Sequence, residues 1–78
     1  MFYSPSWQTL FVNASGLKGK NLLLTVTDLS GRIIYSDKSE TQNAYFTKDL
    51  MMNDFASGLY LITVSTEKEK LTGKVMKE

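Results

Sequence analysis

The chain has 78 residues, no cysteine and no histidine, and nine basic against eight acidic side chains, which give a formal charge of +1. A chain of this length forms one domain that buries only roughly 60% of the surface its unfolded form exposes. The composition excludes disulfides, thiol chemistry and histidine-based catalysis, and the charge is too low for the broad positive face that nucleic acid binding requires.

The segment Met1–Ser6 has neither a charged opening nor a long apolar run, so it is not a secretory signal, and no stretch is long enough to span a bilayer. If the protein is exported, its N-terminal signal lies on a longer precursor. We therefore expect residues 1–78 to be a single domain excised from a larger exported protein.

Apolar residues recur at every second position, and turn-forming residues fall every eight to twelve residues. This pattern is typical of a small all-β sandwich with about seven strands or fewer. A first strand is expected over Gln8–Val12, followed by the turn formers of 13–16. A second strand is expected over Leu22–Thr27. One of its faces packs in the core and carries Leu22, Leu24 and Val26.

The segment Asp28–Arg32 has the composition of a tight hairpin turn. Leu29–Gly31 predicts a three-residue loop closed by Gly31 in the left-handed region, where a Cβ would be strained. Asp28 suits the start of this turn because its carboxylate can accept backbone N–H groups just ahead of it. A third strand is then expected over Ile33–Ser36.

The middle of the chain alternates between polar and mixed segments. Residues Lys38–Asn43 predict a solvated connection, and Ala44–Leu50 predicts a fourth strand. Met51–Ser57 is too irregular for a strand and too short for a stable helix. We expect a loop or a single helical turn there, with Phe55 closing the end of the core.

The most apolar strand in the sequence is expected over Leu59–Ser65, and its beginning is apolar on both faces, as in a central strand covered on two sides. Its core face carries Tyr60, Ile62 and Val64. A Cβ at Gly58 is expected to crowd the beginning of this strand. After the charged turn of 66–69, a last strand from Leu71 is expected to pair antiparallel with 59–65.

Catalysis has little support, because only scattered carboxylates, lysines and tyrosines are available as acid or base. Asp49 and Asp54 lack the closely alternating oxygen ligands that a calcium loop presents. We therefore expect neither an enzyme nor a metal site nor a cofactor.

Four aromatic residues lie near the N-terminus: Phe2, Tyr3, Trp7 and Phe11. They suggest either an aromatic platform for a sugar or side chains that fill and cap a small core. The second interpretation is favoured, because aromatic side chains carry much of the buried area in small domains.

The last part of the chain alternates basic and acidic residues, with lysines at Lys68, Lys70, Lys74 and Lys77. Such a run is typical of a solvated edge strand protected from aggregation. The same edge is also one that a receptor can extend by β-augmentation.

The ordered set of these motifs resembles the C-terminal sorting domain of proteins exported by the type IX secretion system of the Bacteroidota. In that family a D-x-x-G-[RK] hairpin is followed by an apolar residue, a short loop, G-[LIV]-Y and a closing strand with lysines. The matching positions are Asp28, Gly31, Arg32, Leu50, Phe55, Gly58, Leu59, Tyr60, Lys74 and Lys77.

The resemblance implies an immunoglobulin-like antiparallel β-sandwich at the C-terminus of a larger cargo, folded in the periplasm in transit to the cell surface or the medium. It implies recognition by the outer-membrane translocon and removal by a sortase, which attaches some cargoes to surface lipopolysaccharide. Two alternatives stay open, a stand-alone immunoglobulin-like adhesive module and a carbohydrate-binding module.

Overall fold

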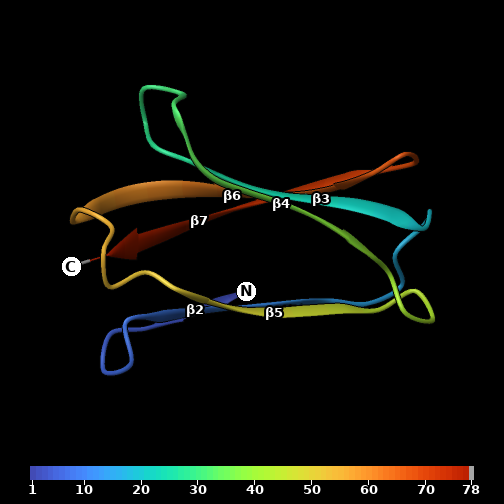
Figure 1. Cartoon of the computed structure of the whole chain (residues 1–78), viewed down its shortest axis with the longest axis horizontal. Helices are drawn as coiled ribbons and strands as arrows, with labels where there is room; N and C mark the ends of the chain where they lie inside the picture. Colours follow the sequence, from blue (N-terminus) through green and yellow to red (C-terminus); the bar gives the residue numbers. More distant parts are fainter. Residues whose placement is uncertain (78) are drawn as a thin grey trace.

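In a computed structural model, which describes residues 1–77, the chain forms two antiparallel β-sheets that lie face to face (Figure 1). The first sheet has three strands in the order β1-β2-β5, and the second has four strands in the order β4-β3-β6-β7. The described residues form no helix. The predicted all-β sandwich is therefore confirmed.

The three-stranded sheet consists of β1 (Phe2–Ser4), β2 (Thr9–Ala14) and β5 (Phe46–Met51). The four-stranded sheet consists of β3 (Asn21–Thr27), β4 (Ile33–Glu40), β6 (Gly58–Thr66) and β7 (Lys70–Lys77). Strand β7 pairs with β6 from Gly58↔Lys77 to Ser65↔Lys70, which confirms the predicted antiparallel pairing of the last two strands.

The core lies between the two sheets. It consists of the side chains that point inward, which are every second residue along a strand. Leu10 and Val12 project into it from β2, and Leu24, Val26 and Ile62 project into it from β3 and β6; each is at most 1% exposed. The predicted core faces of β3 and β6 are thus confirmed. Leu59 and Leu61 on the opposite face of β6 are only half-buried, so the prediction that this strand is covered on two sides is wrong.

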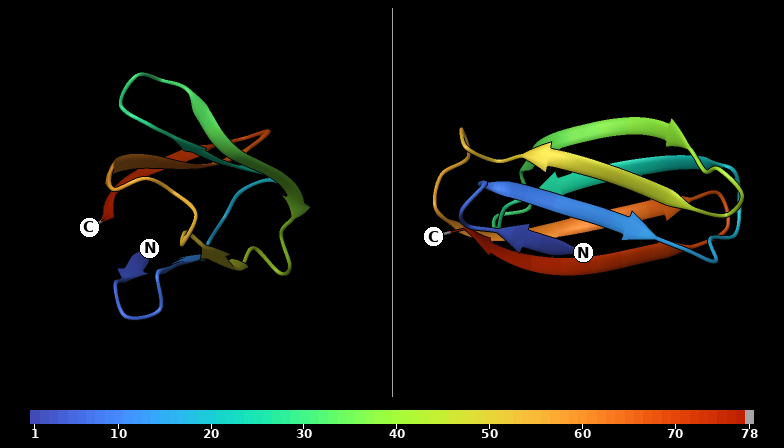
Figure 2. Two further views of the ribbon diagram at one scale, coloured as in Figure 1. Left: turned by 60° about the vertical axis from the view of Figure 1, so that its left-hand side comes forward. Right: turned by 90° about the horizontal axis from the view of Figure 1, so that it is seen from below.

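One end of the sandwich gathers the predicted motif segments. The β3–β4 hairpin, the β5–β6 loop and the end of β7 lie together at the left of Figure 1, away from the β6–β7 turn. The views of Figure 2 show the same arrangement from two other directions. We call this region, comprising 28–32, 54–60 and Lys77, the motif end.

Several predicted strand bounds need correction. Strand β4 continues to Glu40, so 38–40 belong to a strand paired with β3 and not to a solvated connection. An edge strand tolerates such polar residues because one of its sides faces water. Strand β5 begins at Phe46, after Asn43 and Ala44 adopt positive φ angles of 54° and 62°. The short strand β1 was not predicted.

The prediction that the N-terminal aromatic residues fill and cap the core is wrong for Trp7 and Phe2, which are 77% and 62% exposed. Trp7 lies in the turn between β1 and β2, and Phe2 points outward from β1. Tyr3, on the inward side of β1, is partly buried and does pack against the core.

Candidate functional site

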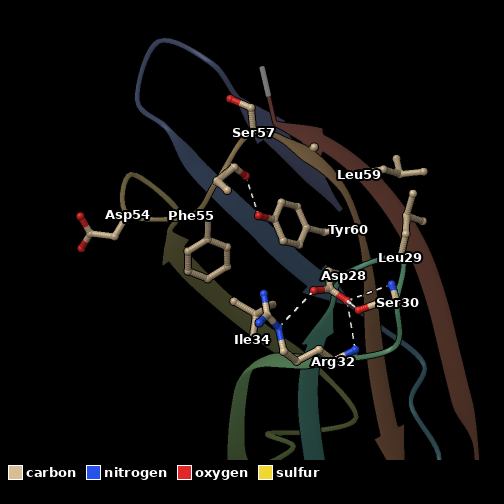
Figure 3. A pocket seen from close by; sticks show the side chains of 12 residues that line it. Asp28, Leu29, Ser30, Arg32, Ile34, Asp54, Phe55, Ser57, Leu59 and Tyr60 are labelled. Carbon is tan, nitrogen blue, oxygen red and sulfur yellow. Dashed lines mark hydrogen bonds and ion pairs between the residues drawn. The ribbon is translucent and has the colours of Figure 1, made fainter.

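The turn between β3 and β4 is organised by the carboxylate of Asp28 (Figure 3). Its Oδ1 accepts hydrogen bonds from the Ser30 backbone N–H at 3.0 Å, the Ser30 hydroxyl at 2.7 Å and the Arg32 backbone N–H at 3.0 Å. The Ser30 hydroxyl contributes most to holding the pKa of Asp28 below its ordinary value, and the backbone donors add to it. Asp28 is therefore a turn-forming group that stays ionised, as its predicted role requires.

Gly31 and Arg32 complete this turn. Gly31 has φ +89° and donates its N–H to the Asp28 carbonyl at 3.1 Å, which confirms the predicted left-handed glycine. The Arg32 Nε lies 3.3 Å from Asp28 Oδ2, while 76% of the Arg32 side chain remains exposed. The guanidinium thus has donors free for a further partner.

Gly58 begins β6 with φ +150°, a conformation that side chains of L-amino acids rarely adopt. No heavy atom lies within 4 Å of the place that a Cβ would take, so the predicted crowding at this position is wrong. The backbone angle, and not the space around a Cβ, therefore explains why glycine occupies this position.

Tyr60 fastens the loop that precedes β6. Its hydroxyl donates a hydrogen bond of 2.5 Å to the Ala56 carbonyl, and its ring lies 5.7 Å from the ring of Phe55 at an interplanar angle of 56° (Figure 3). Phe55 is partly buried against the core and closes its end, as predicted.

A pocket of about 650 Å³ opens between the turn and the loop (Figure 3). It joins the two halves of the sequence motif, which are more than twenty residues apart in the chain. Its walls are mainly apolar, with the Asp28–Arg32 ion pair on one side. The lining residues are Asp28, Leu29, Ser30, Arg32, Ile34, Asp54, Phe55, Ala56, Ser57, Gly58, Leu59 and Tyr60.

The two lysines of the predicted motif differ in their surroundings. Lys77 is only 6% exposed, and its ammonium group donates to the backbone carbonyls of Asn53 (3.3 Å) and Phe55. The expectation of a fully solvated lysine edge is therefore wrong at Lys77. Lys74 is exposed, pairs with Leu61 and lies away from the pocket.

Six of the ten positions that match the family motif thus line one pocket, which also contains residues that were not assigned to the motif. Leu29, Ser30 and Ile34 belong to the hairpin, and Ala56 and Ser57 belong to the loop. In the sequence, only their closeness to motif residues could have indicated that they line the same pocket. Within residues 1–77, no cluster of His, Cys, Asp or Glu suited to a metal ion is found.

The fold and this site define a small antiparallel β-sandwich in which most of the motif residues gather on one end. A family model described as the secretion system C-terminal sorting domain matches residues 1–78, so the chain belongs to the family of type IX secretion sorting domains. No curated protein and no solved structure matches the chain.

Membership in this family makes the chain a C-terminal sorting signal for export to the cell surface or the medium. A sorting domain is attached to a cargo and acts with the secretion machinery, and the family is one of signals rather than enzymes. Among the residues described, no helix is long and apolar enough to cross a membrane.

Proposed function

We propose that the outer-membrane translocon of the type IX system recognises the motif end of this domain and thereby exports the cargo that precedes it. The observation that carries the proposal is the convergence of Asp28, Arg32, Gly58, Leu59 and Tyr60 around one pocket. Chain segments that are distant in sequence form a single surface only in the folded sandwich. A receptor that binds this surface therefore distinguishes a folded signal from an unfolded one.

The pocket supplies the chemistry for binding a polypeptide. Apolar walls with a few oriented polar groups are typical of ligand sites of this size. Arg32 can donate to a carboxylate or a backbone carbonyl of the receptor, because its ion pair with Asp28 uses Nε and leaves most of the side chain exposed. Leu29 is 69% exposed at the rim and offers apolar area.

The edge of β7 is a second element of the proposed recognition. Strand β7 ends the four-stranded sheet, and β1 approaches it from the other sheet without pairing (Figure 2). A receptor strand can add to such an edge through backbone hydrogen bonds. Lys77 links the end of β7 to the pocket wall through the carbonyls of Asn53 and Phe55.

The later steps follow from the same proposal. We infer that the domain folds in the periplasm, that a sortase removes it after passage through the outer membrane, and that the cargo is then released or joined to lipopolysaccharide. The family resemblance supports these steps. The pocket contributes recognition alone and supplies no catalytic group to them.

The test is a periplasmic reporter with this domain fused behind it, expressed in a bacterium that has a type IX system. The intact domain should bring the reporter to the surface or the medium. Arg32→Gln should leave it in the periplasm, because it removes the exposed positive charge and the forked guanidinium donors of the motif end. Deletion of residues 74–78, or a bulky folded tag after Glu78, should have the same effect through the β7 edge.

Lys20→Gln is the matched control for Arg32→Gln. Lys20 is also 76% exposed and forms an ion pair, with Glu40 at 3.5 Å, but it lies outside the motif end. Exposed ion pairs contribute about 0–1 kcal/mol, so both variants should fold normally, which circular dichroism would verify. Equal export of the two variants would contradict recognition at the motif end.

A further inference from the structure

We propose that the outer face of the three-stranded sheet binds the cationic side chain of a partner polypeptide, an arginine or a lysine, in a pocket formed by Trp7, Phe11, Asp49 and Met51. This pocket has a volume of about 510 Å³ and shares no lining residue with the pocket at the motif end. The proposal is independent of the sorting function proposed above.

The strand register places the pocket residues side by side. Because Leu10 and Val12 point into the core, Phe11 points outward, and it pairs with Asp49 of β5. Met51 pairs with Thr9 and is 69% exposed on the same face. The outer face of this sheet is turned toward the viewer in the right-hand view of Figure 2.

Trp7 is held over this face by an ordered turn. Its carbonyl accepts a hydrogen bond of 2.9 Å from the Thr9 hydroxyl, and Gln8 bonds to Pro5 and Met52 through its backbone. Gln8 has φ +48°, an uncommon conformation for a residue other than glycine. The turn therefore presents Trp7, which is 77% exposed, although its indole could have been buried in a small core.

Charge identifies the ligand. Among the strand residues that point outward from this sheet, within residues 1–77, Asp49 is the only charged one. No lysine or arginine in the described residues forms an ion pair with it. A carboxylate that lines one pocket with Trp and Phe side chains can attract a cation through its charge, and the aromatic rings can add a cation–π interaction. A neutral sugar can donate hydroxyl hydrogen bonds to this exposed carboxylate but gains no charge–charge attraction from it.

The apolar surroundings identify the source of the cation as a polypeptide. Phe2 is 62% exposed and stacks on Phe11 with ring centroids 6.3 Å apart, so the apolar face extends beyond the pocket. Exposed Trp, Phe and Met are the residue types enriched at protein interfaces. A free small cation would leave this surrounding area uncovered, whereas an arginine on a peptide brings backbone and neighbouring side chains onto it.

The experiment is an NMR titration of the isotope-labelled domain with a capped tripeptide that has a central arginine. The same peptide with citrulline, which is neutral and of the same shape, is the matched probe. We expect shifts at the Trp7 indole and at the amides of Phe11 and Asp49. Binding of the arginine peptide should be at least about fivefold tighter than binding of the citrulline peptide, and it should weaken at high salt.

Two pairs of variants complete the test. Asp49→Asn and Trp7→Ala should each weaken binding of the arginine peptide at least about fivefold. Glu40→Gln and Tyr45→Ala change a carboxylate and an exposed aromatic residue elsewhere and should leave the affinity unchanged. All four substituted residues are exposed, so an NMR spectrum that changes only near the substituted residue confirms that the variant is folded.

Equal affinity for the arginine and citrulline peptides would overturn the proposal, as would unchanged affinity in Asp49→Asn. A titration with glucose or cellobiose that shifts the same resonances, while the arginine peptide does not, would show a carbohydrate site instead. Because Arg32 and β7 are intact in these variants, loss of peptide binding here is distinguishable from loss of export.

Discussion

Replacing Gly58 with L-alanine tests whether the motif glycine is needed for its backbone angle. The residue has φ +150°, and the space around a Cβ is open to at least 4 Å, so the added methyl group meets no neighbour. Any loss of stability must then come from the backbone conformation. D-alanine has the mirrored backbone preference, so φ +150° does not strain its backbone, and the 78-residue chain is short enough for chemical synthesis.

The expected loss follows from two opposing terms. A residue forced into a sparsely populated backbone region lowers the free energy of unfolding by about 1–3 kcal/mol. The restriction of the unfolded chain by alanine offsets about 0.4–1 kcal/mol of this. The two ranges leave a net loss between about 0 and 2.6 kcal/mol. A loss near the middle of this range, about 1–2 kcal/mol, is a large part of the roughly 4–12 kcal/mol expected for a domain of this length. The melting temperature should fall by about 5–15 °C.

Urea unfolding followed by far-ultraviolet circular dichroism is the suitable assay, because Trp7 is 77% exposed and its fluorescence should change little on unfolding. The L-alanine variant should unfold at lower urea concentration than the wild type, and the D-alanine variant should not. Equal losses in both variants would refute the reasoning, because the backbone angle strains only the L-residue. An unchanged midpoint in the L-alanine variant would show that the angle is not restrictive.

Three other outcomes are expected. Tyr60→Phe should lower the free energy of unfolding by about 0.5–1.5 kcal/mol in urea titrations, because the Ala56 carbonyl loses its hydroxyl donor. Glu67 accepts the N–H of Lys20 at 2.7 Å, and this hydrogen bond lowers the pKa of the Glu67 carboxyl group. The stabilising contribution of Glu67 is therefore present above the unfolded pKa and is lost as the pH falls through the folded pKa. Glu67→Gln should flatten the pH dependence of the melting temperature below a pH of about 5. Deleting 70–78 should make the protein aggregate in light-scattering measurements, because it exposes the uncharged segment 59–64 of β6; a soluble, folded truncation would contradict this.

Local sequence patterns predicted the parts of the fold that depend on local chemistry. The alternation in β3 and β6 determined which side chains face the core, because adjacent residues of a strand point to opposite faces. The Asp28–Arg32 turn was also predictable, because the hydrogen bonds of its carboxylate and the backbone angle of its glycine involve only residues close in sequence. The structural roles of Asp28 and Gly31 in this turn were therefore predicted from the sequence and are confirmed.

The sequence did not predict features that depend on distant contacts. The short strand β1 forms only because Phe2–Ser4 meets β2, and this pairing turns Phe2 toward water. The burial of Lys77 depends on the carbonyls of Asn53 and Phe55, more than twenty residues earlier. The pocket at the motif end likewise requires the turn and the loop to meet, which no local pattern encodes.

The position of β7 has a consequence for the biosynthesis of the cargo. Strand β7 pairs along most of β6, contributes the buried Val75 and anchors the β5–β6 loop through Lys77. In a precursor with this domain at its C-terminal end, β7 is the last strand to leave the ribosome. The sandwich cannot close before translation is complete, so a prematurely terminated cargo has no folded signal. Under the proposed recognition of the folded motif end, even a precursor that ends just before β7 is therefore not exported.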